Sequence, residues 1–380
     1  MTSPRRVVIT GMGTVNAVTA GGAQALASAL GARQSGIRPV RAFDVSGLPS
    51  RLAAEVAEGV LEGLVDRSVA RRLSRLCRLT VAACRLSVQD AGIDGGPALG
   101  LVVGTEQGDF RSSEEFAAGF LRRGVAGLSP MIFPGTVMNA MAAAAAIDVG
   151  ARGPTVTVNQ ATVAGDLAVA RAAALIRSGQ ADAVIAGGVD EICPSVYRRL
   201  VELRALSPMG GALPEGCRPG ALDHNGPVLG EGATFLVLED METAGARGAT
   251  LYAEVKGALW GNIPAAPHTA PARRRDGRSP VLGLLSRLGV PPERLAACYG
   301  SGNGDPALDD WEAALLAAEL PPALLPPRSL APLFGQHGGL GALRVGAAGL
   351  EASRGDGAPA LVHGLARGGC RTAIVVSRPA

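Results

Sequence analysis

Cysteine and histidine are the residue types through which this 380-residue chain could act as a nucleophile, move a proton or bind a metal. It contains six cysteines and four histidines. The cysteines form no Cys-x-x-Cys pair and stand at no metal-ligand spacing from the histidines, so the pattern predicts reduced, buried thiols, with no disulfide, no metal and no cofactor. They are Cys77, Cys84, Cys193, Cys217, Cys298 and Cys370.

Arginine supplies nearly all of the positive charge, because Lys256 is the only lysine, and the formal net charge is +3. This balance gives no support for nucleic-acid binding. Two basic groups are interpreted either as solvated surface or as docking sites for an acidic protein. One consists of Arg71, Arg75 and Arg78 at helical spacing, and the other of Arg273, Arg274, Arg275 and Arg278 in a stretch rich in Pro and Gly.

The composition is that of a large globular protein, with 47% hydrophobic and 18% charged residues. No window of about 18 residues is apolar throughout, so we expect no segment that spans a membrane. The N-terminal sequence MTSPRRVVITGMG passes from two arginines into a strand-like run and lacks the features of a signal peptide. We therefore expect a soluble, cytoplasmic protein.

Strand-like runs alternate with helical segments along the chain, which predicts an α/β layered fold. Residues 6–11 form the first run and residues 24–30 the helix after it. The pattern continues in strand-like runs at 99–104, 155–158, 183–186, 235–239 and 372–376, and in an alanine-rich helix at 167–178. Because both parts of the chain carry β and α elements, we predict a duplicated unit, with halves 1–243 and 244–380.

Five stretches together resemble the β-ketoacyl synthase (ketosynthase) family of the thiolase superfamily. They are VVITGMGTVNAVTAGGAQALASAL from Val7, RGPTVTV from Arg152, SGQADAVIAGGVDE from Ser178, LSPMGG from Leu206 and GPVLGEGATFLVLED from Gly226. The resemblance spans nearly the whole chain. It implies the thiolase fold, in which a duplicated α/β unit gives five layers in the order αβαβα.

The resemblance places Thr162 where active members carry a nucleophilic cysteine, at the start of the helix that follows the RGPTVTV strand. A thiol ionises near pH 8.5 and can be shifted lower at a helix N-terminus, whereas a hydroxyl needs a neighbouring base before it can attack a thioester. The alternative interpretation is a threonine that caps the following helix.

The same comparison places Ser301 at the first catalytic histidine, ahead of a Pro-x-x-Asp-x-x-Glu run that survives as Pro306, Asp309 and Glu312. Gln336 takes the place of the second histidine, and Ala331 that of a lysine. His337 lies one residue later, and a one-residue shift of the loop is the alternative that would bring it into the site.

Two further departures concern the C-terminal region. Ala366, in GLARGGCRT, stands where active members have a gating aromatic next to an oxyanion-hole amide, and the segment before that loop is shortened to residues 354–360. Catalytic groups of this kind act as a unit. The resemblance therefore predicts that the chain does not condense acyl groups and is not an enzyme by itself.

Within the family, these departures resemble the chain-length factor of type II polyketide synthases. That resemblance implies a heterodimer with an active ketosynthase, an acyl tunnel shaped by both subunits, and elongation of a polyketide or fatty-acyl chain on an acyl carrier protein. Candidate tunnel and interface residues lie in a stretch from Leu128 that resembles an interface helix, and in an earlier row of phenylalanines. They are Met131, Ile132, Phe133 and Met138, and Phe110, Phe116 and Phe120. Ordinary interface core is the alternative for the first group.

Two other functions stay open at this point. One is a ketosynthase-like decarboxylase or acyltransferase that is active alone and uses Thr162, Ser301, Gln336 or His337. The other is a scaffold that docks the carrier protein through one of the arginine groups.

Overall fold

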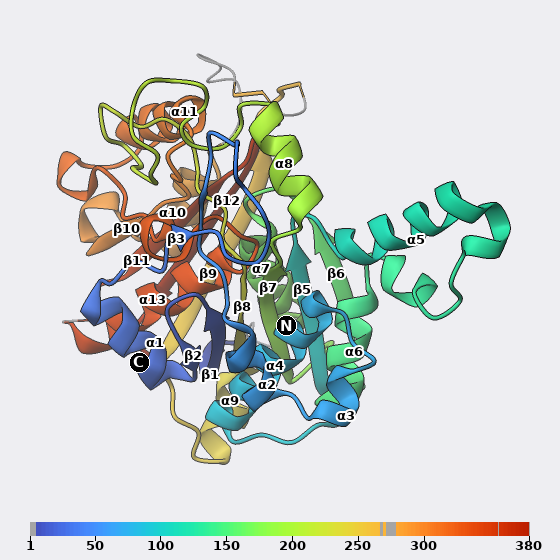
Figure 1. The fold of residues 1–380 in the computed structure, drawn as a ribbon. Helices are drawn as coiled ribbons and strands as arrows, with labels where there is room; N and C mark the ends of the chain where they lie inside the picture. The colour runs from blue at the N-terminus through green and yellow to red at the C-terminus, as the bar shows by residue number, and fades with distance from the viewer. Residues whose placement is uncertain (1–4, 267–268, 271–278, 356, 380) are drawn as a thin grey trace.

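The computed structural model describes residues 5–266, 269–270, 279–355 and 357–379. One ten-stranded sheet runs through this part of the chain, in the order β10-β11-β12-β9-β1-β8-β7-β5-β6, with β2 paired to β1 (Figure 1). Its strands are β1 (Val7–Asn16), β2 (Ala20–Gly21), β5 (Leu99–Thr105), β6 (Thr155–Asn159), β7 (Ala183–Asp190), β8 (Gly232–Asp240), β9 (Ala253–Asn262), β10 (Ala297–Tyr299), β11 (Ala360–Leu365) and β12 (Cys370–Ser377). A separate ribbon pairs β3 (Arg38–Pro39) with β4 (Leu52–Ala53).

Helices cover both outer sides of the strands, and further helices lie between the two sets of strands (Figure 1). Those before β8 are α1 (Ala23–Ala32), α2 (Glu58–Leu64), α3 (Arg67–Ala70), α4 (Arg75–Ala91), α5 (Phe110–Arg123), α6 (Ala140–Asp148), α7 (Ala164–Arg177) and α8 (Pro194–Glu202). Those after it are α9 (Met241–Ala246), α10 (Pro280–Leu288), α11 (Pro306–Ala317), α12 (Ala331–Phe334) and α13 (Leu340–Arg354). Short 3-10 helices are η1 (Gly124–Gly127), η2 (Phe133–Thr136), η3 (Pro292–Arg294) and η4 (Pro322–Leu324).

The central layer consists of α7 and α13, packed between two sets of strands. Strand β1 pairs with β8 along its length but with β9 only through residues 7–9, so the strands of the two halves meet along a short seam. The largest core cluster lies here and joins Val102 of β5 and Ala172 of α7 to Leu343 of α13 and Ile374 of β12. Burial of this apolar surface is the main force that holds the two halves together.

Two outer layers complete the five-layered αβαβα arrangement expected from the sequence. On one side, α4 and α6 pack on Leu101 and Val103, the β5 residues that alternate with Val102. On the other side, α10 packs on Leu361 and Val375. Strands β5, β7 and β8 thus bury both faces, which explains why the sequence shows continuous apolar runs there.

Most predicted elements are confirmed, with two informative differences. Strand β1 continues to Asn16 through Gly11 and Gly13. Glycine is needed at both positions because α4 packs so closely that a Cβ would collide with its backbone. The stretch from Leu128, expected to be one helix, is instead a loop, η2 and α6, since Pro130 and Pro134 interrupt it. The predicted boundary at residue 243 falls within α9, and the division into halves stays a prediction.

The basic group on α4 is largely neutralised. Arg75 contacts Glu231 and Glu58 at 2.5 Å, and Arg78 pairs with Glu58. Only Arg71 of that group is left as an exposed cation among the described residues. The Arg273 group lies outside the described residues.

The expectation about membranes agrees with the helices that the structure describes, because none of them has the length and apolar character needed to cross a bilayer.

A buried ion pair fixes the central layer. Arg344 of α13 donates to both carboxylate oxygens of Asp166 in α7, at 2.9 and 2.8 Å, and both side chains are almost fully buried. Both bonds come from the single nitrogen Nη2, and they tie α13 to α7 through a charge-assisted contact.

We expect Arg344→Ala to lower the free energy of unfolding by about 3–5 kcal/mol, because it leaves the Asp166 carboxylate buried without a partner. Chemical denaturation measures the change. The combined replacement Arg344→Met and Asp166→Leu should lie much closer to the wild type, since it removes both charges. Arg199→Ala, which breaks an exposed pair with Glu202, is the control and should stay within about 0.5 kcal/mol. An equal loss in the single and combined variants would contradict this account.

Candidate functional site at the head of helix α7

The turn between β6 and α7 places Thr162 in a strained backbone conformation. Thr162 is buried and has φ +61°, and the N–H of Val163 donates to the carbonyl oxygen of Ala161 at 2.6 Å across it, which makes a γ-turn. A β-branched residue in the left-handed region is a genuine outlier. Such strain persists at functional sites, where the surrounding fold over-determines it.

The interpretation of Thr162 as a helix cap is wrong. Val163, not Thr162, occupies the N-cap position of α7. Thr162 therefore stands one residue ahead of the helix, on a sharp strand-to-helix turn of the kind that presents a nucleophile.

Glu106 lies beside this turn and was missed by the sequence analysis. It follows β5 directly, at the carboxyl end of a strand whose parallel neighbour β6 leads to Thr162. Burial and the charge of Asp190 raise the pKa of Glu106 to about 7, against the opposing effect of the Thr162 backbone N–H and the Gln336 side chain. The carboxyl group thus holds or releases a proton near neutral pH. The sequence signal for Glu106 was an acidic residue directly after a buried parallel strand, where ligand sites of such sheets lie.

Gln336 presents an amide donor to the same space. Its side-chain oxygen accepts from Asn303 Nδ2 at 3.3 Å, while its own Nε2 is buried and has no hydrogen-bond partner among the described residues. The Nε2 group approaches Glu106 without forming a regular hydrogen bond. An unsatisfied buried N–H needs an acceptor, and a carbonyl oxygen of a bound acyl group would supply one.

Ser301 is held in a separate buried network. Its hydroxyl donates to Glu312 Oε1 at 2.8 Å and accepts from the Leu365 N–H at 2.9 Å. Glu312 also contacts His363 Nδ1 at 2.6 Å, and Arg371 donates to His363 Nε2 at 3.1 Å, so the imidazole carries its proton on Nδ1. Burial opposes the charge of Glu312, but the hydrogen bonds from His363 and Ser301 outweigh it and lower its pKa. The Ser301 hydroxyl is therefore a structural link.

His337 lies on a different side from Gln336. Its Nδ1 accepts from the Gly339 N–H at 3.1 Å, and its ring lies near the Gly232 backbone at the start of β8. Burial lowers the pKa of His337 to about 4, so the imidazole is neutral at pH 7. Gln336, and not His337, shares the neighbourhood of Glu106 and Asn303.

The sequence profile described as "Beta-ketoacyl synthase, N-terminal domain" matches residues 4–244. The chain belongs to the β-ketoacyl synthase family. It is 31% identical to a "3-oxoacyl-[acyl-carrier-protein] synthase 2" of Synechocystis sp. over 316 residues, which cover 81% of this chain and 75% of the relative. A protein of the same name from Coxiella burnetii is also 31% identical, over 81% of this chain and 76% of the relative.

Solved structures of ketosynthases have the same fold. "The ishigamide ketosynthase/chain length factor" has a TM-score of 0.86 and 27% identity and covers both chains fully. A β-ketoacyl synthase from Burkholderia phymatum has a TM-score of 0.84, with 99% of this chain covered, and at 24% identity it supports the fold alone. These matches identify the five-layered arrangement as the thiolase fold of ketosynthases.

These relatives correct the prediction that the chain is not an enzyme by itself. The relatives that are 31% identical over 81% of the chain are named as enzymes. The prediction was wrong because it treated the exchange of the nucleophile, both histidines, the lysine and the gating aromatic as the loss of the site. The strained turn at Thr162, the titrating carboxyl of Glu106 and the free donor of Gln336 remain together.

Ala366, at the position of the gating aromatic, lies in the tight turn between β11 and β12. Its N–H donates to the carbonyl oxygen of Cys370 at 2.9 Å, which closes that turn. Ala331, at the lysine position, is buried at the start of α12.

The predicted tunnel residues gather around α5 and η2. Most are exposed, namely Phe110, Phe120, Met131, Phe133 and Met138. Phe116 stacks on Phe133 with ring centroids 5.7 Å apart, and Met131 and Ile132 line a cavity of about 520 Å³. Their role in a tunnel stays a prediction.

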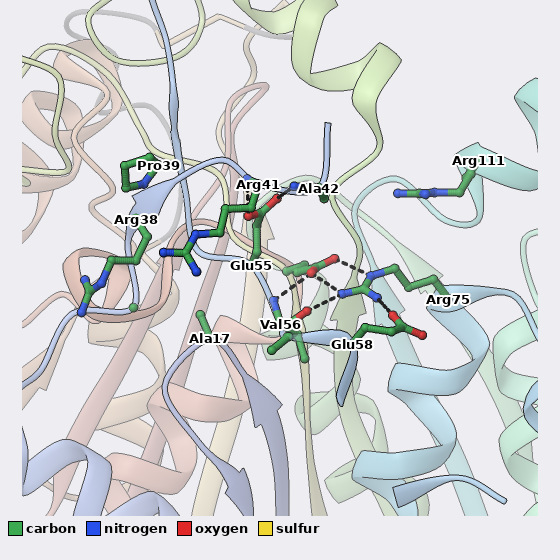
Figure 2. A pocket seen from close by; sticks show the side chains of 13 residues that line it. Ala17, Arg38, Pro39, Arg41, Ala42, Glu55, Val56, Glu58, Arg75 and Arg111 are labelled. Atoms are coloured by element: carbon green, nitrogen blue, oxygen red, sulfur yellow. Dashed lines mark hydrogen bonds and ion pairs between the residues drawn. The ribbon is translucent and has the colours of Figure 1, made fainter. Parts of the chain in front are cut away.

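A cavity next to the β3–β4 ribbon is separate from this site. It has a volume of about 560 Å³, and Thr162, Glu106 and Gln336 are not among its lining residues. Figure 2 shows its charges: Glu55 accepts from the Arg41 and Ala42 backbone, and Arg75 pairs with acidic neighbours. Its acidic groups are thus largely satisfied within the chain.

We expect Glu106→Gln to stabilise the protein at pH 8 by up to about 3 kcal/mol. The pKa of Glu106 is raised from 4.5 to about 7 in the folded chain, so the folded chain binds the extra proton, and stability falls as the pH rises between these values. Urea denaturation at pH 5 and at pH 8 measures the effect. A difference between wild type and variant that does not change with pH would refute the assignment.

We expect Thr162→Gly to raise the free energy of unfolding by about 1 kcal/mol, because glycine enters the left-handed region without a Cβ clash. Thermal unfolding followed by circular dichroism measures it. Thr157→Gly, the same change in the extended strand β6, is the control and should lower stability by about 0.5–1 kcal/mol. Destabilisation by both changes would contradict the strain at Thr162.

Proposed function

We propose that this chain is the chain-length-factor subunit of a two-subunit β-ketoacyl synthase. It pairs with a ketosynthase subunit that carries the Cys-His-His residues and lines the acyl tunnel during elongation on an acyl carrier protein. The observation that carries the proposal is the apolar face between residues 110 and 147. The name of the ishigamide ketosynthase/chain length factor, the neighbour with 27% identity, is in line with it.

Exposed apolar side chains are concentrated in one segment of the chain. Nine of the fourteen exposed large hydrophobic side chains in the described part of the chain lie within residues 110–147. They are Phe110, Phe120, Leu121, Val125, Met131, Phe133, Val137, Met138 and Ile147. Apolar side chains gathered in this way are typical of protein interfaces. In Figure 1, α5 extends away from the body of the molecule, where a second subunit would cover it.

Strand β6 gives the same face an unpaired edge. It is the last strand on its side of the sheet and pairs only with β5. An open edge with free N–H and C=O groups favours the addition of a strand from another chain. A partner seated on α5, η2 and α6 would therefore be able to extend the sheet at β6.

Substrate delivery by an acyl carrier protein follows from the same proposal. One solved neighbour, with 22% identity, is titled as a type II polyketide synthase ketosynthase in complex with its acyl-carrier protein. Arg71 and Arg72 line the cavity next to Ile132 and give this side of the chain positive charge for an acidic carrier.

A second candidate function is an acyltransferase or decarboxylase reaction in the chain's own site. The observation in its favour is the position of Glu106 and Gln336 next to the strained turn at Thr162. Incubation of the chain alone with an acyl thioester tests it, and an ester on Thr162 detected by mass spectrometry would support it.

We expect substitutions of Ile132 to change the length of the product made by the reconstituted heterodimer. Ile132→Ala should allow at least one further extension unit, and Ile132→Phe should end growth earlier, because overpacking costs about 1–3 kcal/mol while each buried methylene contributes about 0.8 kcal/mol. Mass spectrometry of the products measures the length. Leu282→Ala, on the exposed surface of α10, is the control. An unchanged product length across the Ile132 series would remove it from the tunnel wall.

A further inference from the structure

A chain of hydrogen bonds fixes the orientation of the Gln336 side chain. The Asp305 N–H donates to Asn303 Oδ1 at 3.1 Å, so the other end of that amide, Nδ2, is the end that donates to Gln336 Oε1 at 3.3 Å. An amide side chain has one acceptor end and one donor end. Because Asn303 engages the acceptor end of Gln336, the donor end, Nε2, points elsewhere. Asn303 and Gln336 are both buried, so this direction is set by the fold.

The backbone of Glu106 is held beside the same loop. Its N–H donates to the Asp190 carboxylate at 3.1 Å, and the Gly338 N–H, two residues after Gln336, donates to the other oxygen of that carboxylate at 2.7 Å. The Glu106 carbonyl oxygen accepts from Asn159 Nδ2 at 2.9 Å. Asn159 ends β6, directly before the strained turn. Hydrogen bonds thus join Glu106 to both of the segments that surround it.

The Glu106 carboxyl group lies between two N–H donors. It approaches the Thr162 backbone N–H and the Gln336 side chain. The Thr162 N–H bonds to no backbone acceptor in the described part of the chain, and Gln336 Nε2 is buried without a regular partner there. Two donors that converge on one space form a hole for a carbonyl oxygen. We call this pair, Thr162 N–H and Gln336 Nε2, the two-donor hole.

A neutral carbonyl group suits the two-donor hole better than an anion does. The buried charge of Asp190 already raises the pKa of Glu106, and it would oppose a second negative charge in the same way. The carbonyl oxygen of an acyl thioester carries no charge and has two lone pairs. It could accept from both donors at once, which would satisfy the buried Nε2 group.

We propose that Glu106 is an internal plug, a side chain that fills the two-donor hole and that an acyl carbonyl group must displace in order to bind at the head of α7. Glu106 is partly exposed and follows the end of β5, so its side chain can turn toward solvent while the strands stay in place. The apparent affinity for the ligand is then reduced by the fraction of chains in which the plug is out. The inference holds whether or not the chain pairs with a ketosynthase subunit.

The experiment measures how tightly the purified full chain binds a short acyl thioester, S-acetyl-N-acetylcysteamine. We expect Glu106→Ala to bind it about tenfold more tightly than the wild type, because the variant removes the plug. Isothermal titration calorimetry measures both dissociation constants. Glu114→Ala is the matched control and should leave the constant unchanged, since Glu114 is an exposed carboxylate on α5 that accepts from Ser195 Oγ at 2.8 Å. Acetate should bind Glu106→Ala more weakly than the thioester does.

A second variant tests whether the two-donor hole, rather than the space left by the Glu106 side chain, holds the ligand. Gln336→Leu has a similar size but no donor. Combined with Glu106→Ala, it should weaken binding of the thioester about tenfold, because one hydrogen bond to the carbonyl oxygen is lost. Far-UV circular dichroism checks that each variant keeps its secondary structure.

The pH dependence of wild-type binding gives a third readout, which needs no substitution at Gln336. Burial and the charge of Asp190 raise the pKa of Glu106 to about 7. The carboxylate accepts from the two donors more strongly than the protonated carboxyl group does. The wild type should therefore bind the thioester up to about tenfold more tightly at pH 6 than at pH 8, and Glu106→Ala should lose this dependence. That variant keeps the other charged or titratable groups of the surrounding segments, namely Asp109, Asp166, Asp190, His337 and Arg344.

Three outcomes would decide the inference. Equal affinity of the wild type and Glu106→Ala, or no binding by either, would overturn it, and so would binding by Glu106→Ala that Gln336→Leu leaves unchanged. Tighter binding by Glu106→Ala, with loss of the pH dependence, supports it. No partner takes part in the measurement, so failure of the inference would leave the proposed function standing.

Discussion

The candidate site depends on the buried carboxylate of Asp190. Its oxygens accept from the Thr105 hydroxyl at 2.7 Å, from the Glu106 and Gln107 backbone at 3.1 Å each, and from the Gly338 backbone at 2.7 Å. These donors come from the end of β5 and from the loop that carries Gln336. One side chain at the end of β7 thus fixes both segments that face Thr162. Burial raises the pKa of Asp190, and its charge in turn favours the protonated form of Glu106.

The exchange at Ser301 is compensated locally. Glu312 finds its partners in His363 and in Ser301. Arg371 in turn donates to His363 and pairs with Glu319 at 2.8 Å. A buried carboxylate stays acceptable only with such donors. Ser301 is therefore part of a satisfied buried network, whereas Gln336 keeps an unpaired amide donor.

The fold was more predictable from the sequence than the site was. Continuous apolar runs mark strands that are buried on both faces, and this rule found β5, β7 and β8 with small errors at their ends. The position of Thr162 could be inferred from its surroundings, but its γ-turn could not, because nothing in the residue type favours positive φ. Glu106 was missed because its pKa is raised by burial and by Asp190, which is distant in sequence. His363 was missed because its role depends on Glu312, which lies 51 residues away in the sequence.

The ion pair between Asp166 and Arg344 limits how this chain can be recombined. The two residues lie 178 positions apart and on helices from different halves. A hybrid that joins the first half of this chain to the second half of a relative contains Asp166. It contains the matching arginine only if the relative has one at the position of Arg344. The duplicated architecture looks modular, yet a working hybrid would have to keep both Asp166 and Arg344 in its central layer.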